Sequence, residues 1–162
     1  MKTSKASLAK TYLPAHTVLR SLALCVALAA AWPSLAQPLP VVDVYKSPEC
    51  GCCKAWAEHL KKSGFTVNLH DVDDVPAARK KLGMPDHYGS CHTAKVGQYL
   101  LEGHVPAADI KKLLKNHPKA IGIAVPSMPL GSPGMEVEGE RPVPYDTLLV
   151  TQDGKATVFA HH

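Results

Sequence analysis

The stretch VVDVYKSPECGCCKAWAEHLKKSG, residues 41–64, decides the fold of this chain. Its first part, residues 41–47, is rich in apolar and β-branched side chains and predicts a short buried strand. Residues 54–63 carry their apolar side chains on one face and predict a helix, which Gly64 ends. Three cysteines lie between the two elements, so the junction of strand and helix is the expected site of chemistry.

The hydrophobic pattern downstream predicts further strands and helices. Residues 65–73 alternate apolar and polar side chains as a strand does, and residues 75–82 predict a short helix. Residues 93–103 predict a hairpin, and Pro106 opens another helix. The resulting order, β-α-β-α-β-β-α, predicts an α/β fold with a thioredoxin-like plan.

Residues 120–146 differ in composition from the rest of the chain. Their many prolines and glycines argue against a regular helix or a central strand. We therefore expect a long functional loop or a segment that wraps around the core. Two short apolar runs around Gly154 then predict a terminal hairpin. The expected domain is a thioredoxin-like core followed by a Pro/Gly-rich C-terminal extension, residues 120–162.

Residues 1–36 have the features of a signal peptide. They contain basic but no acidic residues, an uncharged run over residues 21–31, and the small residues Ser34 and Ala36 before the expected cleavage point. The uncharged run is too short to span a bilayer. We therefore expect an exported mature domain, residues 37–162.

Removal of the signal peptide changes the charge balance. The chain has 18 Lys and Arg against 14 Asp and Glu, and four of the basic residues but none of the acidic ones lie in residues 1–36. The mature domain is then formally neutral, which argues against a nucleic-acid partner. Without a long apolar run, we expect no membrane partner after cleavage.

Cys50, Cys52 and Cys53 are the strongest chemical signal in the sequence. A disulfide between adjacent cysteines is strained, and so tight a cluster does not staple distant loops together, so metal binding is favoured over structural disulfides. Thiolates at a helix N-terminus are stabilised by the helix dipole. The alternatives are small buried cysteines and a thiol–disulfide oxidoreductase that uses Cys50 and Cys53.

Five further residues are candidate metal ligands. Cys91 and His92 precede the predicted hairpin, in a loop that a thioredoxin-like fold places against the cysteine cluster, although His92 alone fits a solvated loop equally well. Met128 and Met135 lie in the proline-rich segment, and their soft thioethers favour Cu(I), with core packing as the usual alternative. His104 follows the hairpin and is the last candidate.

The softness of these donors favours copper. The adjacent Cys52 and Cys53 suit thiolates that bridge two or more Cu(I) ions better than they suit chelation of a single ion. Zinc in a tetrahedral set of cysteines remains an alternative, as the core of a structural module. The known cysteine spacings of iron–sulfur proteins differ from those of this chain.

The motifs YKSPECGCCKAW, SCHTAKV, GHVPAADI and VPSMPLGSPGMEV occur in this order and together resemble the copper-resistance-linked CopG family. This is the periplasmic family, not the DNA-binding repressor of the same name, and the resemblance covers roughly residues 41–160. It implies a thioredoxin-like periplasmic protein with a multinuclear copper site on Cys50, Cys52, Cys53 and Cys91. It further implies copper and silver tolerance and a redox role between Cu(I) and Cu(II). Copper ions are the expected cargo, and other periplasmic copper-handling proteins the expected partners.

Overall fold

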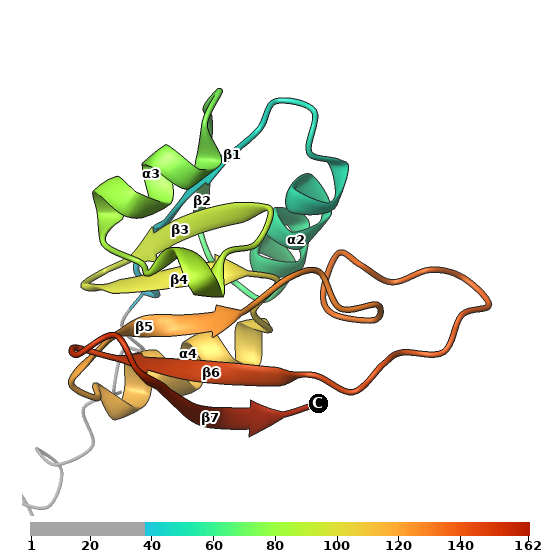
Figure 1. Cartoon of the computed structure of the whole chain (residues 1–162). Coiled ribbons are helices and arrows are strands. Elements are labelled where there is room, and N and C mark those ends of the chain that lie inside the picture. The colour runs from blue at the N-terminus through green and yellow to red at the C-terminus, as the bar shows by residue number, and fades with distance from the viewer. Residues whose placement is uncertain (1–37) are drawn as a thin grey trace, which may run out of the picture. The chain divides into compact units, whose positions relative to one another are not determined.

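The computed structural model describes residues 38–162, so the predicted signal peptide lies outside the described residues. In the described part, seven strands form one sheet in the order β2-β1-β3-β4-β5-β6-β7 (Figure 1). The strands are β1 (Val42–Lys46), β2 (Val67–Asp71), β3 (His92–Val96), β4 (Tyr99–Gly103), β5 (Ala120–Val125), β6 (Asp146–Thr151) and β7 (Ala156–His161). The helices are α2 (Gly51–Lys62), α3 (Val75–Leu82) and α4 (Ala107–Asn116), and η1 (Asp86–Tyr88) is a 3₁₀ turn.

The sheet is mixed. β1 pairs in parallel with β2 and β4 with β5, whereas the other neighbouring strands run antiparallel. The predicted α/β class and the order of its first seven elements are confirmed. The thioredoxin-like description of that part stays a prediction. No described helix has both the length and the apolar character that crossing a membrane requires.

The prediction for residues 120–146 is wrong in its first part. Residues 120–125 form β5, an interior strand between β4 and β6, because the prolines begin only at Pro126 and the sequence before it is apolar. Gly122 has no side chain to obstruct its pairing with Leu100 of β4. The C-terminal extension therefore adds three strands to the sheet, and within residues 120–146 the part without regular structure is residues 126–145.

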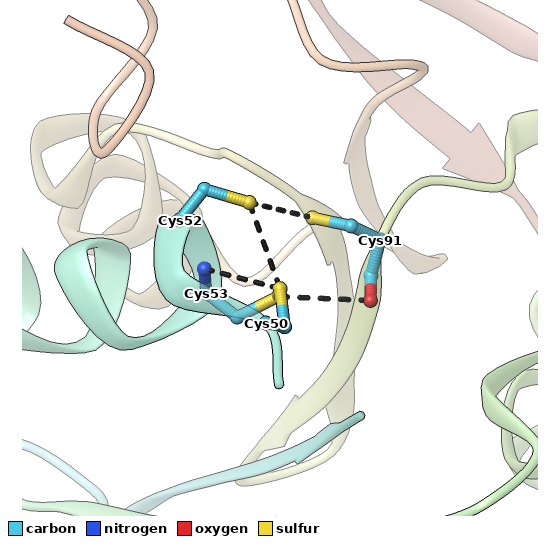
Figure 2. A group of neighbouring side chains, drawn as sticks. All are labelled: Cys50, Cys52, Cys53 and Cys91. Atoms are coloured by element: carbon cyan, nitrogen blue, oxygen red, sulfur yellow. Dashed lines mark hydrogen bonds between the residues drawn. A yellow bond between two sulfur atoms is a disulfide. The ribbon is translucent and has the colours of Figure 1, made fainter. Parts of the chain in front are cut away.

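Helix α2 begins at Gly51, earlier than the predicted start at Lys54. Cys50 is the N-cap residue, and its sulfur accepts a hydrogen bond from the backbone N–H of Cys53. Cysteine is not among the usual capping residues, so the sequence carried no signal for this start. As a result Cys52 and Cys53 lie in the first turn of the helix, facing Cys91 (Figure 2).

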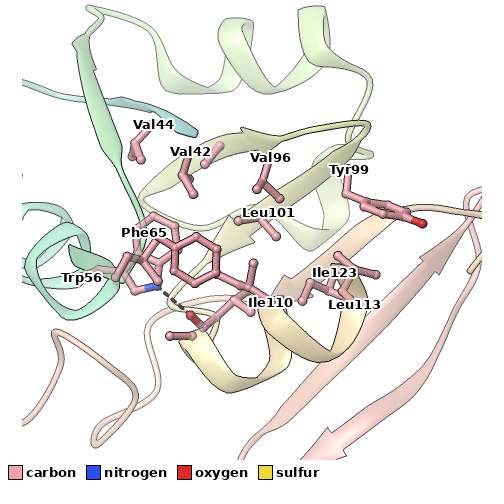
Figure 3. Packing of buried hydrophobic residues seen from close by; sticks show 14 of the residues in the cluster. Val42, Val44, Trp56, Phe65, Val96, Tyr99, Leu101, Ile110, Leu113 and Ile123 are labelled. Atoms are coloured by element: carbon pink, nitrogen blue, oxygen red, sulfur yellow. Dashed lines mark hydrogen bonds between the residues drawn. The ribbon is translucent and has the colours of Figure 1, made fainter. Parts of the chain in front are cut away.

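The sheet separates two hydrophobic clusters. Helices α2 and α4 cover one face, where Trp56 and Ile110 pack against Val44 of β1 and Leu101 of β4 (Figure 3). Trp56 also donates its indole N–H to the carbonyl of Val105, at 2.8 Å, which ties α2 to the start of α4. A second cluster joins β4, β5 and β6 to the region around η1, and its buried members are Met84, Tyr88, Leu100, Ala124 and Val150.

Candidate metal centre

The N-terminal turn of α2 positions the cysteine cluster. The Cys53 N–H donates to Cys50 Sγ over 3.3 Å, and Cys52 lies on the same turn. No acidic residue occupies this turn. The positive end of the helix dipole therefore acts on the sulfurs without a competing carboxylate, which favours thiolates and anionic ligands at this place.

Cys50 and Cys53 form a disulfide in this structure, whereas Cys52 and Cys91 are free thiols. Cys52 Sγ lies 3.5 Å from Cys50 Sγ and 3.8 Å from Cys91 Sγ (Figure 2). Disulfide sulfurs are not thiolate ligands. Metal binding by Cys50 and Cys53 therefore requires that two electrons and two protons first convert the disulfide into two thiols.

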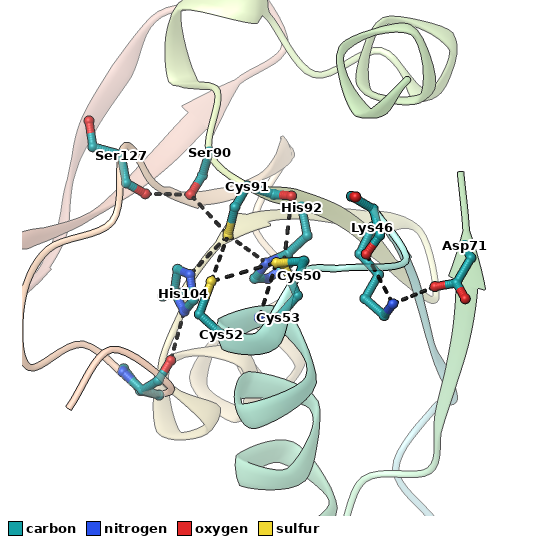
Figure 4. Close-up of a disulfide and its surroundings, with 12 residues drawn as sticks. Lys46, Cys50, Cys52, Cys53, Asp71, Ser90, Cys91, His92, His104 and Ser127 are labelled. Atoms are coloured by element: carbon teal, nitrogen blue, oxygen red, sulfur yellow. Dashed lines mark hydrogen bonds and ion pairs between the residues drawn. A yellow bond between two sulfur atoms is a disulfide. The ribbon is translucent and has the colours of Figure 1, made fainter. Parts of the chain in front are cut away.

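The β3–β4 hairpin brings two histidines to Cys91. Cys91 precedes β3 and His104 follows β4, so the antiparallel pairing places both at the same end of the hairpin. Cys91 Sγ lies 3.0 Å from His104 Nε2 and 3.3 Å from His92 Nδ1 (Figure 4). The His92 ring packs on the indole of Trp56, with ring centroids 4.3 Å apart.

Both histidines offer a buried ring nitrogen. His104 Nδ1 donates to the carbonyl oxygen of Pro133 at 2.8 Å, so its Nε2 presents a lone pair toward Cys91 Sγ. His92 Nε2 is buried, and among the described residues it has no hydrogen-bond partner. An unpartnered polar atom is costly in a protein interior. This arrangement fits ligand positions better than it fits a solvated loop histidine.

Burial determines the protonation of these groups. Burial first, and then the neighbouring Cys52, raises the pKa of Cys91 to about 12. Burial lowers the pKa of His92 to about 3 and also lowers the pKa of His104. At neutral pH the metal-free protein therefore holds a protonated Cys91 thiol beside two neutral imidazoles. A metal ion must displace a proton from Cys91 but none from the histidines.

Two groups of donors in the described residues could each hold a metal ion. The atoms of each group lie within 4.8 Å of one another, and the groups are Cys50, Cys52, Cys53 and Cys91, and Cys91, His92 and His104. Cys91 belongs to both groups, so its sulfur is placed to bridge them. A set of thiolates and imidazoles suits copper and also zinc. The structure thus brings all six predicted cysteine and histidine ligands together.

The segment of residues 126–145 passes over this site and contacts it. Besides the hydrogen bond between Pro133 and His104, Gly134 lies so close to α2 that an added Cβ would be 2.8 Å from the carbonyl oxygen of Cys52. Gly134 also has a positive φ of 85°, a conformation that glycine adopts at no steric cost. Residues 126–145 therefore contact both His104 and the first turn of α2, which carries the cysteines.

The two predicted methionine ligands lie in this segment and differ in exposure. Met128 is 49% exposed, whereas Met135 is half-buried and directly follows Gly134, the residue packed on α2. Their roles as ligands stay predictions, and the position of Met135 is the more favourable of the two.

A buried ion pair behind Cys91 was not identified from the sequence. Arg79 Nε donates to Glu102 Oε1 at 2.8 Å, and a second guanidinium nitrogen donates to the carbonyl oxygen of Ser90 at 2.7 Å. The backbone N–H of Ser90 donates to the same Glu102 oxygen at 2.8 Å. The available signal was the single charge within the apolar strand YLLEG, since a carboxylate is rarely buried without a partner.

Comparisons with known proteins give the family. A model of the family described as "Protein of unknown function, DUF411" matches residues 88–135, which include Cys91, His92 and His104 but not the CGCC cluster. No curated protein matches the chain. Among solved structures, one described as "Copper resistance protein copG- Form 2" is 45% identical, with a TM-score of 0.73, and the match covers 78% of this chain and 99% of that chain. The chain belongs to the CopG family. The predicted resemblance is thereby confirmed.

A second CopG structure, described as form 1, is similar to the same extent. It is 45% identical with a TM-score of 0.72, and the match covers 78% of this chain and 98% of that chain. The CopG fold is therefore shared over nearly the whole length of the solved relatives. The DUF411 model matches the part of the chain that carries Cys91 and His104. This match therefore includes the histidine side of the donor cluster.

Proposed function

We propose that this CopG-family protein serves copper resistance by binding copper ions. The proposal is supported by the described function of the solved CopG relatives and by the cluster of cysteines and histidines that could hold a metal. Thiolates and imidazoles are donors that copper accepts readily, and His104 Nε2 already presents a lone pair toward Cys91 inside the protein.

The finer part of the proposal is a site for several Cu(I) ions. One observation carries it: Cys91 Sγ belongs to both donor groups, so a single thiolate can bridge ions held on either side. Cys50, Cys52 and Cys53 supply the sulfur side, and His92 and His104 supply the nitrogen side, with Met135 or Met128 as shielding donors. Soft thiolates select Cu(I) over harder divalent ions.

We extend the proposal to conversion between Cu(II) and Cu(I). The Cys50–Cys53 pair is a two-electron couple located within van der Waals contact of the free Cys52 thiol. Two Cu(II) ions would each accept one electron as the two thiols become a disulfide and release two protons. Cys52, Cys91 and the histidines would then remain as ligands for the Cu(I) produced.

We also propose that the protein acts in the periplasm after export. This part rests on residues 1–36, whose basic start, short apolar run and small residues are typical of a signal peptide. The Cys50–Cys53 disulfide also supports an oxidising compartment, since such pairs are kept reduced in the cytosol. Copper-handling proteins of the same compartment are the proposed partners.

The test of this function is a metal titration of the reduced mature protein without oxygen, combined with a count of free thiols. We expect two or more Cu(I) ions per chain and the loss of all titratable thiols after loading. Uptake of a single zinc ion and no copper would contradict the proposal and indicate a structural zinc module. Addition of Cu(II) to the same reduced protein should form the Cys50–Cys53 disulfide as Cu(I) appears.

Copper binding should weaken as the pH falls. Because the Cys91 pKa is about 12 and that of His92 about 3, Cys91 is protonated in the metal-free protein while the histidine stays neutral. Each proton displaced from a thiol makes the apparent affinity about tenfold lower per pH unit of acidification. Competition titrations with a Cu(I) chelator between about pH 6 and pH 8 check this expectation. A constant affinity over that range would contradict ligation by Cys91.

A thiol–disulfide oxidoreductase is the second candidate, because the structure shows a C-x-x-C disulfide at a helix N-terminus. Against it, the free Cys52 thiol lies 3.5 Å from Cys50 Sγ, where it would form competing disulfides. Reduction of insulin disulfides separates the two functions. Rapid turnover that disappears in both Cys50→Ser and Cys53→Ser would support the oxidoreductase, and turnover no faster than that of a free dithiol would exclude it.

A further inference from the structure

Glu102 and Arg79 form a buried network directly behind the donor cluster. The Glu102 side chain is fully buried and that of Arg79 nearly so. Together they hold both polar groups of the Ser90 backbone: Glu102 accepts from the Ser90 N–H, and Arg79 donates to the Ser90 carbonyl oxygen. Ser90 directly precedes Cys91, whose sulfur extends toward the other donors (Figure 4). The network therefore fixes the backbone at the point from which the bridging cysteine extends.

The same network also contacts the backbone that leads to His104. Glu102 lies on β4, two residues before His104, and the intervening Gly103 touches Ser90, because an added Cβ at Gly103 would lie 2.7 Å from Ser90 Cβ. The Ser90 side chain is therefore packed directly on the backbone that leads to His104. Displacement of Ser90 would change the 3.0 Å separation of Cys91 Sγ and His104 Nε2.

Stability alone does not account for this pair. Removing two charges from water costs several kcal/mol for each ion, and well-packed apolar residues are often as good or better in such a place. One oxygen of Glu102, Oε2, is also buried without a hydrogen-bond partner among the described residues. The pair instead supplies directional hydrogen bonds to one residue. The planar guanidinium donates to the Ser90 carbonyl oxygen, and the carboxylate accepts from the Ser90 N–H.

We propose that Arg79 and Glu102 are positioning residues that set the location of Cys91 between the sulfur and the histidine donors. The inference rests on the proposed copper-binding function, and it assigns neither residue as a ligand. It follows that weakening the pair should lower the Cu(I) affinity only while Cys91 is present as a donor.

The test is a double-mutant cycle on Cu(I) affinity, measured by competition with a chelator. Glu102→Gln removes the charge while keeping the shape, and Arg79→Lys keeps the charge but loses the fork that reaches Glu102 and Ser90 together. Each is expected to weaken Cu(I) binding about tenfold in the wild-type background. In a Cys91→Ser background, where the other thiolates still bind copper, neither should have an effect. Glu58→Gln, which breaks an exposed pair with Lys61, is the matched control and should bind as wild type.

Each outcome decides the proposal. An equal loss of affinity with and without Cys91 would overturn it, because the pair would then act on the whole fold. Wild-type affinity in both variants would overturn it as well. Loss of cooperative unfolding in both variants would also overturn it, since a positioning pair is dispensable for folding. Absence of copper binding by the wild-type protein would instead refute the proposed function, so the two failures are distinguishable.

Discussion

Replacing Cys91 with serine is expected to lower both the copper stoichiometry and the affinity of the remaining ions. Cys91 is shared by the two donor groups. Its partners are cysteine sulfurs in one group and histidine nitrogens in the other. A serine hydroxyl is a harder and weaker ligand for Cu(I) than a thiolate. We expect the loss of at least one ion per chain and a weakening of tenfold or more, about 1.4 kcal/mol. Cu(I) titration of the reduced variant measures both quantities.

The comparison with other variants makes this result specific. Cys50→Ser removes a donor from only one of the two groups and should have a smaller effect than Cys91→Ser. His161→Ala is the control, since this histidine is 81% exposed at the end of β7 and pairs with Asp146. Unchanged stoichiometry in both Cys91→Ser and Cys52→Ser would refute the assignment of the cluster.

Replacing Gly122 with alanine should have the largest effect on stability, a loss of about 4 kcal/mol or more. An added Cβ would lie 2.6 Å from the backbone carbonyl carbon of Leu100 and 2.8 Å from its nitrogen. Leu100 cannot move aside, because β4 is hydrogen-bonded to β3 on one edge and to β5 on the other. Since a domain of this size is stable by only about 5–15 kcal/mol, this loss would remove a large share of the free energy of unfolding.

Urea denaturation of the metal-free protein measures this effect, with Gly51→Ala as the matched control. Gly51 lies at the start of α2, and an added Cβ there would meet nothing within 4 Å. Alanine at this place should change the free energy of unfolding by no more than about 1 kcal/mol. Equal midpoints for the two variants would contradict the pairing of Gly122 with Leu100.

The elements that the sequence predicted well are those governed by local chemistry. Helix α3 spans residues 75–82 as predicted, since Asp74 caps its start by accepting from the Ala77 N–H and Gly83 adopts the left-handed conformation at its end. The hairpin of β3 and β4 also follows its predicted range. The alternation of apolar and polar side chains and the choice of turn residues are features of a few neighbouring positions. They therefore predict structure without knowledge of the partner strand.

The elements that the sequence predicted poorly depend on distant partners. The start of α2 was placed too late because its cap is a cysteine sulfur rather than a common capping group. Strand β5 was missed because its glycine and the prolines beyond it argue against a strand in general. They are tolerated here because Gly122 faces the Leu100 backbone and Pro126 lies outside the strand.

The sequence by itself determined the α/β class, the cysteine cluster at the end of β1, the soft donor types and the relation to CopG. Tertiary structure alone decided which donors meet, because the hairpin register aligns Cys91 with His104, and a shift of one residue would turn the side chains to the other face. It also decided that Glu102 is paired, since its partner Arg79 lies on helix α3, far from Glu102 in sequence. Spacing along the chain records local periodicity, whereas convergence at a site depends on strand pairing and packing between residues far apart in sequence.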